Sequence, residues 1–190
     1  MKNVNFNPLF QAIDNLILHN ETVLIAIDGN STSGKSTLAE VLKSKYDANV
    51  FHMDDYFRSK KQGKTDTLYG SNIDIERLNK EVIDAINQNR DVLYHSFDCK
   101  SQTLSKEKKQ SKKQINIIEG AFSMHPKIHA TYHLKVLLKS SLLQQIRRIV
   151  KRNGFKALKD FLFKWIPNEK KYIKYYHLEK EANFIFKSKH

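Results

Sequence analysis

The chain has 190 residues, of which 40% are hydrophobic and 11% aromatic, a composition typical of one folded domain with a sizeable core. Its single cysteine, Cys99, excludes an internal disulfide framework, and no apolar run reaches the roughly 18 residues of a membrane span. The net charge of +13 favours anionic partners such as nucleic acid, an acidic surface or phosphorylated small molecules. The N-terminal twenty residues predict an amphipathic helix rather than a signal peptide. We therefore predict a cytoplasmic protein that does not bind membranes.

A phosphate-binding loop pattern follows the first predicted strand. The segment TVLIAID (22–28) predicts a buried strand, and GNSTSGKS then matches G-x-x-x-x-G-K-[ST] at the start of a helix that ends near Tyr46. Gly29 and Gly34 permit backbone angles that a Cβ atom would oppose, so the loop can turn its N–H groups toward phosphate oxygens. The positive end of the helix dipole points at the same anion.

Two side chains of this loop have predicted roles in nucleotide binding. Lys35 can neutralise the β- and γ-phosphates, and the hydroxyl of Ser36 can ligate Mg²⁺. The alternative is a Gly/Ser-rich turn that binds nothing, but the strand before and the apolar-periodic helix after are the context that the motif requires. We predict that ATP and Mg²⁺ bind here. The residues expected to hold the nucleotide are Gly29, Asn30, Ser31, Thr32, Ser33, Gly34, Lys35, Ser36 and Thr37.

A second short strand is predicted over 49–55, and it ends in the adjacent acids Asp54 and Asp55. A carboxylate near the γ-phosphate could orient and deprotonate an attacking hydroxyl. Neighbouring side chains of an extended chain point in opposite directions, so only one of the two acids can face the phosphate site. These residues alone do not decide which one it is.

The remaining chain alternates between predicted strands and helices. Helical spacing covers 74–89, a strand or hairpin covers 91–97, and strands follow at 115–122 and 132–140; helices at 141–154, 155–165 and 168–182 precede a last strand at 183–186. Gly154 is the predicted C-cap of the first of these helices. The segment 100–114, with six lysines and one glutamate, is predicted to be a solvated loop. The alternation favours an α/β fold whose parallel sheet has helices on both faces.

Two later motifs add candidate site residues. Glu119 ends the strand INIIE at the edge of the sheet where ligands of open α/β folds bind, and it could hold Mg²⁺ directly or through water. Arg147 and Arg148, with Lys151 and Arg152 one turn later, could offset charge that develops during phosphoryl transfer. A solvated basic helix face is the alternative for these residues.

Taken in order, these motifs resemble those of the uridine kinase and phosphoribulokinase group of P-loop kinases, which includes nicotinamide riboside and pantothenate kinases. The resemblance covers about 22–186 and includes the phosphate loop GNSTSGKST, the acidic-aromatic motif HMDDYFR, the Asn-x-Asp segment SNID, the strand end IIEG and the Arg-Arg lid helix QQIRRIVKR. It implies a three-layer P-loop NTPase fold as a single domain over 1–190, with a small helical lid at about 141–165.

By the same resemblance, Asp54 is the catalytic base and Asp74 holds the hydroxyls of the acceptor. Tyr94, or Phe97 with Asp98, takes the place of a Tyr-Asp pair that recognises the base in nucleoside kinases. The sequence departs from the family here, because the region reads YHSFDCKSQT and no histidine follows Asp98. Base recognition is therefore less well defined than the phosphate site.

The implied reaction is the transfer of the γ-phosphate of ATP to a hydroxyl of a small molecule, with uridine or cytidine favoured. The predicted catalytic residues are Lys35, Asp54, Arg147 and Arg148. Two alternatives remain. The charge of +13 suggests a polynucleotide 5′-hydroxyl kinase, although no aromatic residue interrupts the lysines of 100–114 as in a single-strand platform. The second alternative is a nucleotide-dependent switch without transferase activity. The sequence is also compatible with a homo-oligomer.

Overall fold

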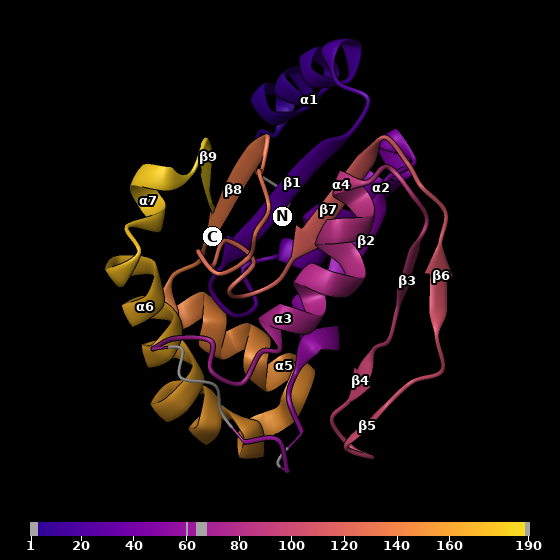
Figure 1. Ribbon diagram of the computed structural model, residues 1–190. Helices are drawn as coiled ribbons and strands as arrows, with labels where there is room; N and C mark the ends of the chain where they lie inside the picture. Colours follow the sequence, from indigo (N-terminus) through magenta and orange to yellow (C-terminus); the bar gives the residue numbers. More distant parts are fainter. Residues whose placement is uncertain (1–3, 60, 64–67, 189–190) are drawn as a thin grey trace.

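The computed structural model describes residues 4–59, 61–63 and 68–188, and Figure 1 shows a central sheet with helices around it. The sheet has five parallel strands in the order β2-β7-β1-β8-β9. These strands are β2 (Asn49–His52), β7 (Ile115–Glu119), β1 (Val23–Gly29), β8 (Leu134–Lys139) and β9 (Phe184–Lys187). All seven residues of β1 are buried, which explains the apolar run Val23–Ile27 that precedes Asp28. The predicted parallel α/β sheet is confirmed.

Helices cover both faces of this sheet. They are α1 (Asn7–His19), α2 (Lys35–Tyr46), α3 (Ile75–Leu78), α4 (Asp84–Asn87), α5 (Leu142–Asp160), α6 (Ile166–Tyr175) and α7 (Leu178–Glu181). A π-helical turn η2 (Asn79–Ile83) joins α3 to α4, and a second, η3 (Phe161–Trp165), joins α5 to α6. None of the helices in the described residues is long and apolar enough to cross a membrane.

Alternate residues of β1 enter two separate apolar clusters. Val23, Ile25 and Ile27 pack with α1 and α2 on one face, whereas Leu24 and Ala26 pack with the run 75–86 and with α6 and α7 on the other. This alternation follows from the two-residue period of a strand. It produces the three layers that the sequence predicts.

The second strand is shorter than predicted. β2 ends at His52, and Met53–Tyr56 forms a 3₁₀ turn, η1, with Asp54 and Asp55 in its first turn. Acidic side chains are favourable at this end of a helical turn because the backbone N–H groups there lack partners. Successive side chains of a 3₁₀ turn diverge by about 120°, so the two acids point in different directions.

The strand or hairpin predicted over 91–97 is confirmed, because β3 (Val92–Tyr94) and β4 (Phe97–Asp98) lie there, outside the main sheet. The segment 100–114 was predicted as a loop but supplies the antiparallel partner strands of two ribbons. β3 pairs with β6 (Lys108–Gln110), and β4 pairs with β5 (Thr103–Leu104). Lysines 106, 108 and 109 are exposed, as expected of a solvated segment. The pairing was not foreseen because Lys, Gln and Ser carry little strand propensity.

The basic helix ends where the sequence predicts. α5 spans Leu142–Asp160 as a whole, but Gly154, the predicted C-cap, has the non-helical angles φ 78° and ψ 171°. Two helical segments therefore meet at this glycine, as predicted for 141–154 and 155–165. The segment predicted as a lid, 141–165, corresponds to α5 and η3.

Gly29 is the glycine whose replacement should cost the most stability. An added Cβ would lie 1.9 Å from the Leu138 carbonyl oxygen of β8, and φ is 140°. Gly154 also has positive φ but has nothing within 4 Å of an added Cβ. Backbone strain alone costs about 1–3 kcal/mol, so Gly154→Ala should lower the free energy of unfolding by about that amount. Gly29→Ala should lower the free energy of unfolding by clearly more. Equal unfolding midpoints of the two variants would contradict the close approach of Gly29 to Leu138.

Candidate active site

The phosphate loop, residues 29–37, joins the carboxyl end of β1 to the first turn of α2. Gly34 adopts φ 102°, a backbone angle suited to glycine. The first helical hydrogen bond there runs from the Leu38 N–H to the Gly34 carbonyl at 3.0 Å. The amides of Lys35, Ser36 and Thr37 precede this bond and lie at the open N-terminus of the helix, whose first turn carries no acid. An anion is therefore favoured at this point.

Lys35 lies folded over the same loop. Its Nζ donates to the carbonyl oxygens of Gly29 and Asn30, at 2.9 Å each. These contacts keep the ammonium group at the mouth of the loop, where it can meet phosphate oxygens.

The loop forms one wall of a cavity of about 970 Å³. Its residues Ser31, Thr32, Ser33, Gly34, Lys35, Ser36 and Thr37 line it, whereas Gly29 and Asn30 do not. The opposite walls come from η1, from the loop after β7 and from α5, η3 and α6. The volume is in the range of pockets that hold nucleotides and drug-sized ligands.

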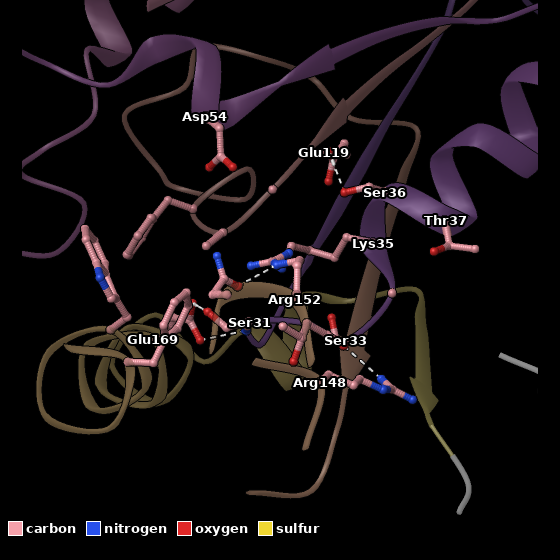
Figure 2. Close-up of a pocket in the computed structure, with 18 of the residues that line it drawn as sticks. Ser31, Ser33, Lys35, Ser36, Thr37, Asp54, Glu119, Arg148, Arg152 and Glu169 are labelled. Carbon is pink, nitrogen blue, oxygen red and sulfur yellow. Dashed lines mark hydrogen bonds between the residues drawn. The ribbon is translucent and has the colours of Figure 1, made fainter. Parts of the chain in front are cut away.

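Glu119 and Ser36 meet at the base of this cavity (Figure 2). The Ser36 hydroxyl donates to Glu119 Oε1 at 3.1 Å, and His52 Nδ1 lies 2.5 Å from the same oxygen. Glu119 is 5% exposed, and its hydrogen bond raises the pKa of His52 above its ordinary value. The three side chains come from α2, β7 and β2, so the parallel sheet brings them together.

Asp54 lines the cavity, and Asp55 does not. Figure 2 shows the Asp54 carboxylate pointing into the cavity, across from the phosphate loop. Its side chain is open to the cavity but enclosed by protein elsewhere, and this partial desolvation raises the pKa of Asp54. The nearby Glu119 carboxylate raises this pKa further, whereas Lys35 lowers it. Asp55 lies beside Arg77, which donates to its backbone carbonyl at 2.7 Å. The geometry thus favours Asp54 over Asp55 as the acid that faces the phosphate site.

One of the two predicted arginines lies in the site. Arg148 lines the cavity and donates to the Thr32 carbonyl at 2.8 Å, whereas Arg147 is exposed and not part of the lining. One turn later, Lys151 and Arg152 also line the cavity. Helix periodicity explains the difference, because Arg148, Lys151 and Arg152 share one face of α5.

Two buried acids near the loop were not predicted. Glu169 of α6 accepts hydrogen bonds from the Ser31 amide at 2.8 Å and from its hydroxyl at 2.5 Å. Asp28, at the end of β1, accepts from the Gly29 amide at 2.6 Å. Burial raises the pKa of both carboxyl groups. Asp28 could have been predicted, because an acid at the end of a buried strand is unusual. Glu169 could not, because it lies in the charged segment NEKK, which is typical of a solvent-exposed helix.

The residues predicted to bind the acceptor lie outside the cavity lining of the described residues. Asp74 caps α3 by accepting from the Arg77 amide at 3.2 Å, and Arg58 and Arg77 lie 3.9 Å from its carboxylate. Tyr94 is buried in the core and its hydroxyl accepts from Gln110. Asp98 is exposed at the end of β4 and accepts from the Lys100 amide. The next residue, Cys99, lines the cavity instead.

The donor atoms suit Mg²⁺ with a nucleotide. Magnesium prefers hard oxygen ligands and takes many of them from phosphates and water, and the Ser36 hydroxyl and Glu119 carboxylate supply two such oxygens beside the loop. No cluster of three or more His, Cys, Asp or Glu that could hold a metal ion occurs in the described part of the chain. The residues present therefore fit an ion shared with a bound phosphate.

Comparison with known proteins identifies the fold. No family model matches the chain, and no curated protein matches it. Among solved structures, a possible uridine kinase from Bacillus stearothermophilus has a TM-score of 0.64 and 21% sequence identity, over 94% of this chain and 98% of that one. A second, from Thermus thermophilus, has a TM-score of 0.49 and 17% identity, over 90% of this chain and 91% of the other. The chain thus has an α/β P-loop kinase-like fold.

The contact between His52 and Glu119 predicts a pH response that NMR can measure. The carboxylate stabilises the charged imidazole, so His52 should titrate above its ordinary pKa of about 6.5. Its contribution to stability is fully present below that value and is lost as the pH rises through the raised pKa. In Glu119→Gln the pKa of His52 should fall. The variant His52→Gln identifies the His52 resonance, because that resonance is missing from its spectrum. An unchanged His52 pKa in Glu119→Gln would contradict the assignment.

Proposed function

We propose that the protein is a Mg²⁺-dependent kinase that transfers the γ-phosphate of ATP to a hydroxyl of a small molecule. The observation that carries this proposal is that the phosphate loop and the Asp54 carboxylate line one cavity from opposite walls. A binding protein needs only the loop. A kinase also needs a base across from it, at the place where the acceptor hydroxyl would stand.

In this proposal each wall of the cavity has a separate task. The amides of Lys35, Ser36 and Thr37 and the Lys35 ammonium group hold the phosphates, while Asp54 orients the acceptor hydroxyl and accepts its proton. Mg²⁺ held by Ser36 and Glu119 would neutralise phosphate charge when bound. Arg148, Lys151 and Arg152 face the same cavity and would stabilise the negative charge of the transferred group. Positioning and electrostatics supply most of the rate in such reactions.

The raised pKa of Asp54 supports its role as a base. A carboxylate whose pKa is raised is more basic while it remains ionised, which increases its drive to take the hydroxyl proton. Lys35, His52 and Arg152 oppose the shift and keep the anionic form accessible.

A nucleoside is the acceptor that we propose. Apolar and aromatic side chains lie around the cavity beside Asp54, namely Phe57, Ile73, Phe122, Phe161 and Trp165. Such walls suit a planar ring better than a bare sugar. The predicted acceptor contacts remain Asp74 and either Tyr94 or Phe97 with Asp98, and contact with the acceptor would require this region to move toward the cavity. We also propose that the chain acts as one kinase domain whose lid is the segment 141–165.

The proposal is tested by direct detection of the product. The protein would be incubated with Mg·ATP and a panel of nucleosides, nicotinamide riboside, pantothenate, ribose sugars and a 5′-hydroxyl oligonucleotide, with phosphorylated products identified by mass spectrometry. We expect a phosphorylated nucleoside. A labelled oligonucleotide would favour the polynucleotide kinase, and ATP binding without any product would favour the nucleotide-dependent switch.

Asp54→Asn should reduce transfer by about 10²-fold or more, because general base catalysis contributes on that scale. ATP binding should remain nearly unchanged, since the phosphate loop is intact. Asp55→Asn is the matched control, because it removes a neighbouring carboxylate that does not line the cavity. Loss of transfer in Asp55→Asn, with Asp54→Asn active, would reverse the assignment.

Lys35→Ala should lower turnover by about 10²-fold or more, because it removes a charge that acts directly on the transferred phosphate. The exposed Lys43, on the same helix, provides the control Lys43→Ala. Circular dichroism should show that both variants are folded. Near-normal turnover in Lys35→Ala would exclude the phosphate loop as the catalytic site.

A further inference from the structure

A second cavity, of about 480 Å³, lies behind the phosphate loop and shares no lining residue with the first. Residues from the end of β8, the start of α5, and from α6 and α7 line it. Asn30 is the phosphate-loop residue that lines it. The proposed kinase reaction uses none of its side chains, so its properties need a separate explanation.

Positive charge surrounds this cavity. Lys139, Lys170, Lys174 and Lys180 line it, and we refer to it as the basic cavity. Its one acid, Glu179, pairs with Lys139 at 2.5 Å. The other three lysines form no ion pair with any described residue. The N-terminus of α5, whose first helical segment runs from Leu142 to the kink at Gly154, adds the positive end of its dipole.

The floor of the basic cavity is polar and incompletely hydrogen-bonded. Gln145 is 1% exposed and its Nε2 donates to the Ser140 carbonyl at 3.1 Å, but its Oε1 has no donor among the described residues. The Ser140 hydroxyl, also buried, has no partner there either. Buried polar atoms are nearly always paired, so two neighbouring unpaired ones point to a group that is supplied from outside.

An apolar wall limits the kind of ligand that fits. Ile173, 8% exposed, and Leu142 face the same space, where they can pack against a short carbon skeleton. The cations suit a doubly charged oxyanion, and the Gln145 carbonyl oxygen requires a hydrogen-bond donor. Together these features describe a small phosphate monoester that also carries a hydroxyl group.

We propose that the basic cavity binds such a phosphate monoester. The phosphate lies among Lys170, Lys174 and Lys180, and a hydroxyl of the ligand donates to Gln145 Oε1. Asn30 links this cavity to the nucleotide cavity, because its backbone carbonyl accepts from Lys35. The inference does not depend on kinase activity, and it is tested by binding alone.

The test is calorimetric titration of the full chain with glycerol 3-phosphate, inorganic phosphate and glycerol as probes. Glycerol 3-phosphate should bind more tightly than inorganic phosphate, and glycerol should not bind. The double variant Lys170→Ala with Lys174→Ala should weaken binding of glycerol 3-phosphate by about tenfold or more, since each removed charge-assisted hydrogen bond changes affinity on that scale. Both lysines are exposed, so the fold should be unaffected.

Two controls separate this site from other phosphate binding. Lys156→Ala with Lys171→Ala removes the same charge from exposed positions outside both cavities and should leave binding unchanged. A complete loss of glycerol 3-phosphate binding in Lys35→Ala would place the phosphate on the phosphate loop. Gln145→Leu should weaken the binding of glycerol 3-phosphate more than the binding of inorganic phosphate. Absence of binding to the wild-type chain, or equal losses in the two double variants, would overturn the proposal.

Discussion

The arrangement of the cavity depends on the carboxylate of Asp28. It is buried at the end of β1 and accepts hydrogen bonds from the Gly29 amide, from the Met124 amide at 2.9 Å and from the Tyr172 hydroxyl at 2.8 Å. These donors belong to the phosphate loop, to the segment after β7 and to α6, so one side chain fixes three walls relative to one another. Burial raises the pKa of Asp28, because desolvation disfavours the charged carboxylate, and the three hydrogen bonds act in the opposite direction. Removal of any one donor would raise this pKa further and release one wall from the others.

Glu169 extends the same principle along α6. It lies one helical turn before Tyr172 and Ile173 and holds the Ser31 amide and hydroxyl, so α6 contacts the start of the phosphate loop at two points. The cost of a buried acid beside a phosphate site is repulsion of the incoming anion. Lys35, Arg148, Lys151 and Arg152 outnumber the acids Asp54, Glu119 and Glu169 around the cavity, and they offset that repulsion. The acids then serve to position groups, and the cations to attract the ligand.

How much could be predicted from the sequence depended on the range of the interactions. The phosphate loop, β1, α2 and the end of β7 at Glu119 follow from local patterns, because backbone geometry and strand burial leave short signatures in the chain. The choice between Asp54 and Asp55 required the 3₁₀ turn, and the choice between Arg147 and Arg148 required the orientation of α5. Glu169 and the two ribbons depend on contacts between segments distant in sequence, where polar residues give no periodic signal. The hydroxyl-binding role of Asp74 stays a prediction, because its carboxylate here caps α3 beside two arginines.

Helix α6 contributes residues to both cavities. Its Glu169 faces the nucleotide cavity, while Lys170, Ile173 and Lys174 face the basic cavity, and Asn30 adjoins the loop from behind. Lys170 and Glu169 are adjacent in α6, so a ligand at the basic cavity would contact the helix that holds Ser31. If such a ligand changes the affinity for nucleotide by some factor, nucleotide must change the affinity for that ligand by the same factor. The +13 charge of the chain therefore need not indicate nucleic acid, since part of it surrounds two small, separate cavities that are each suited to phosphate.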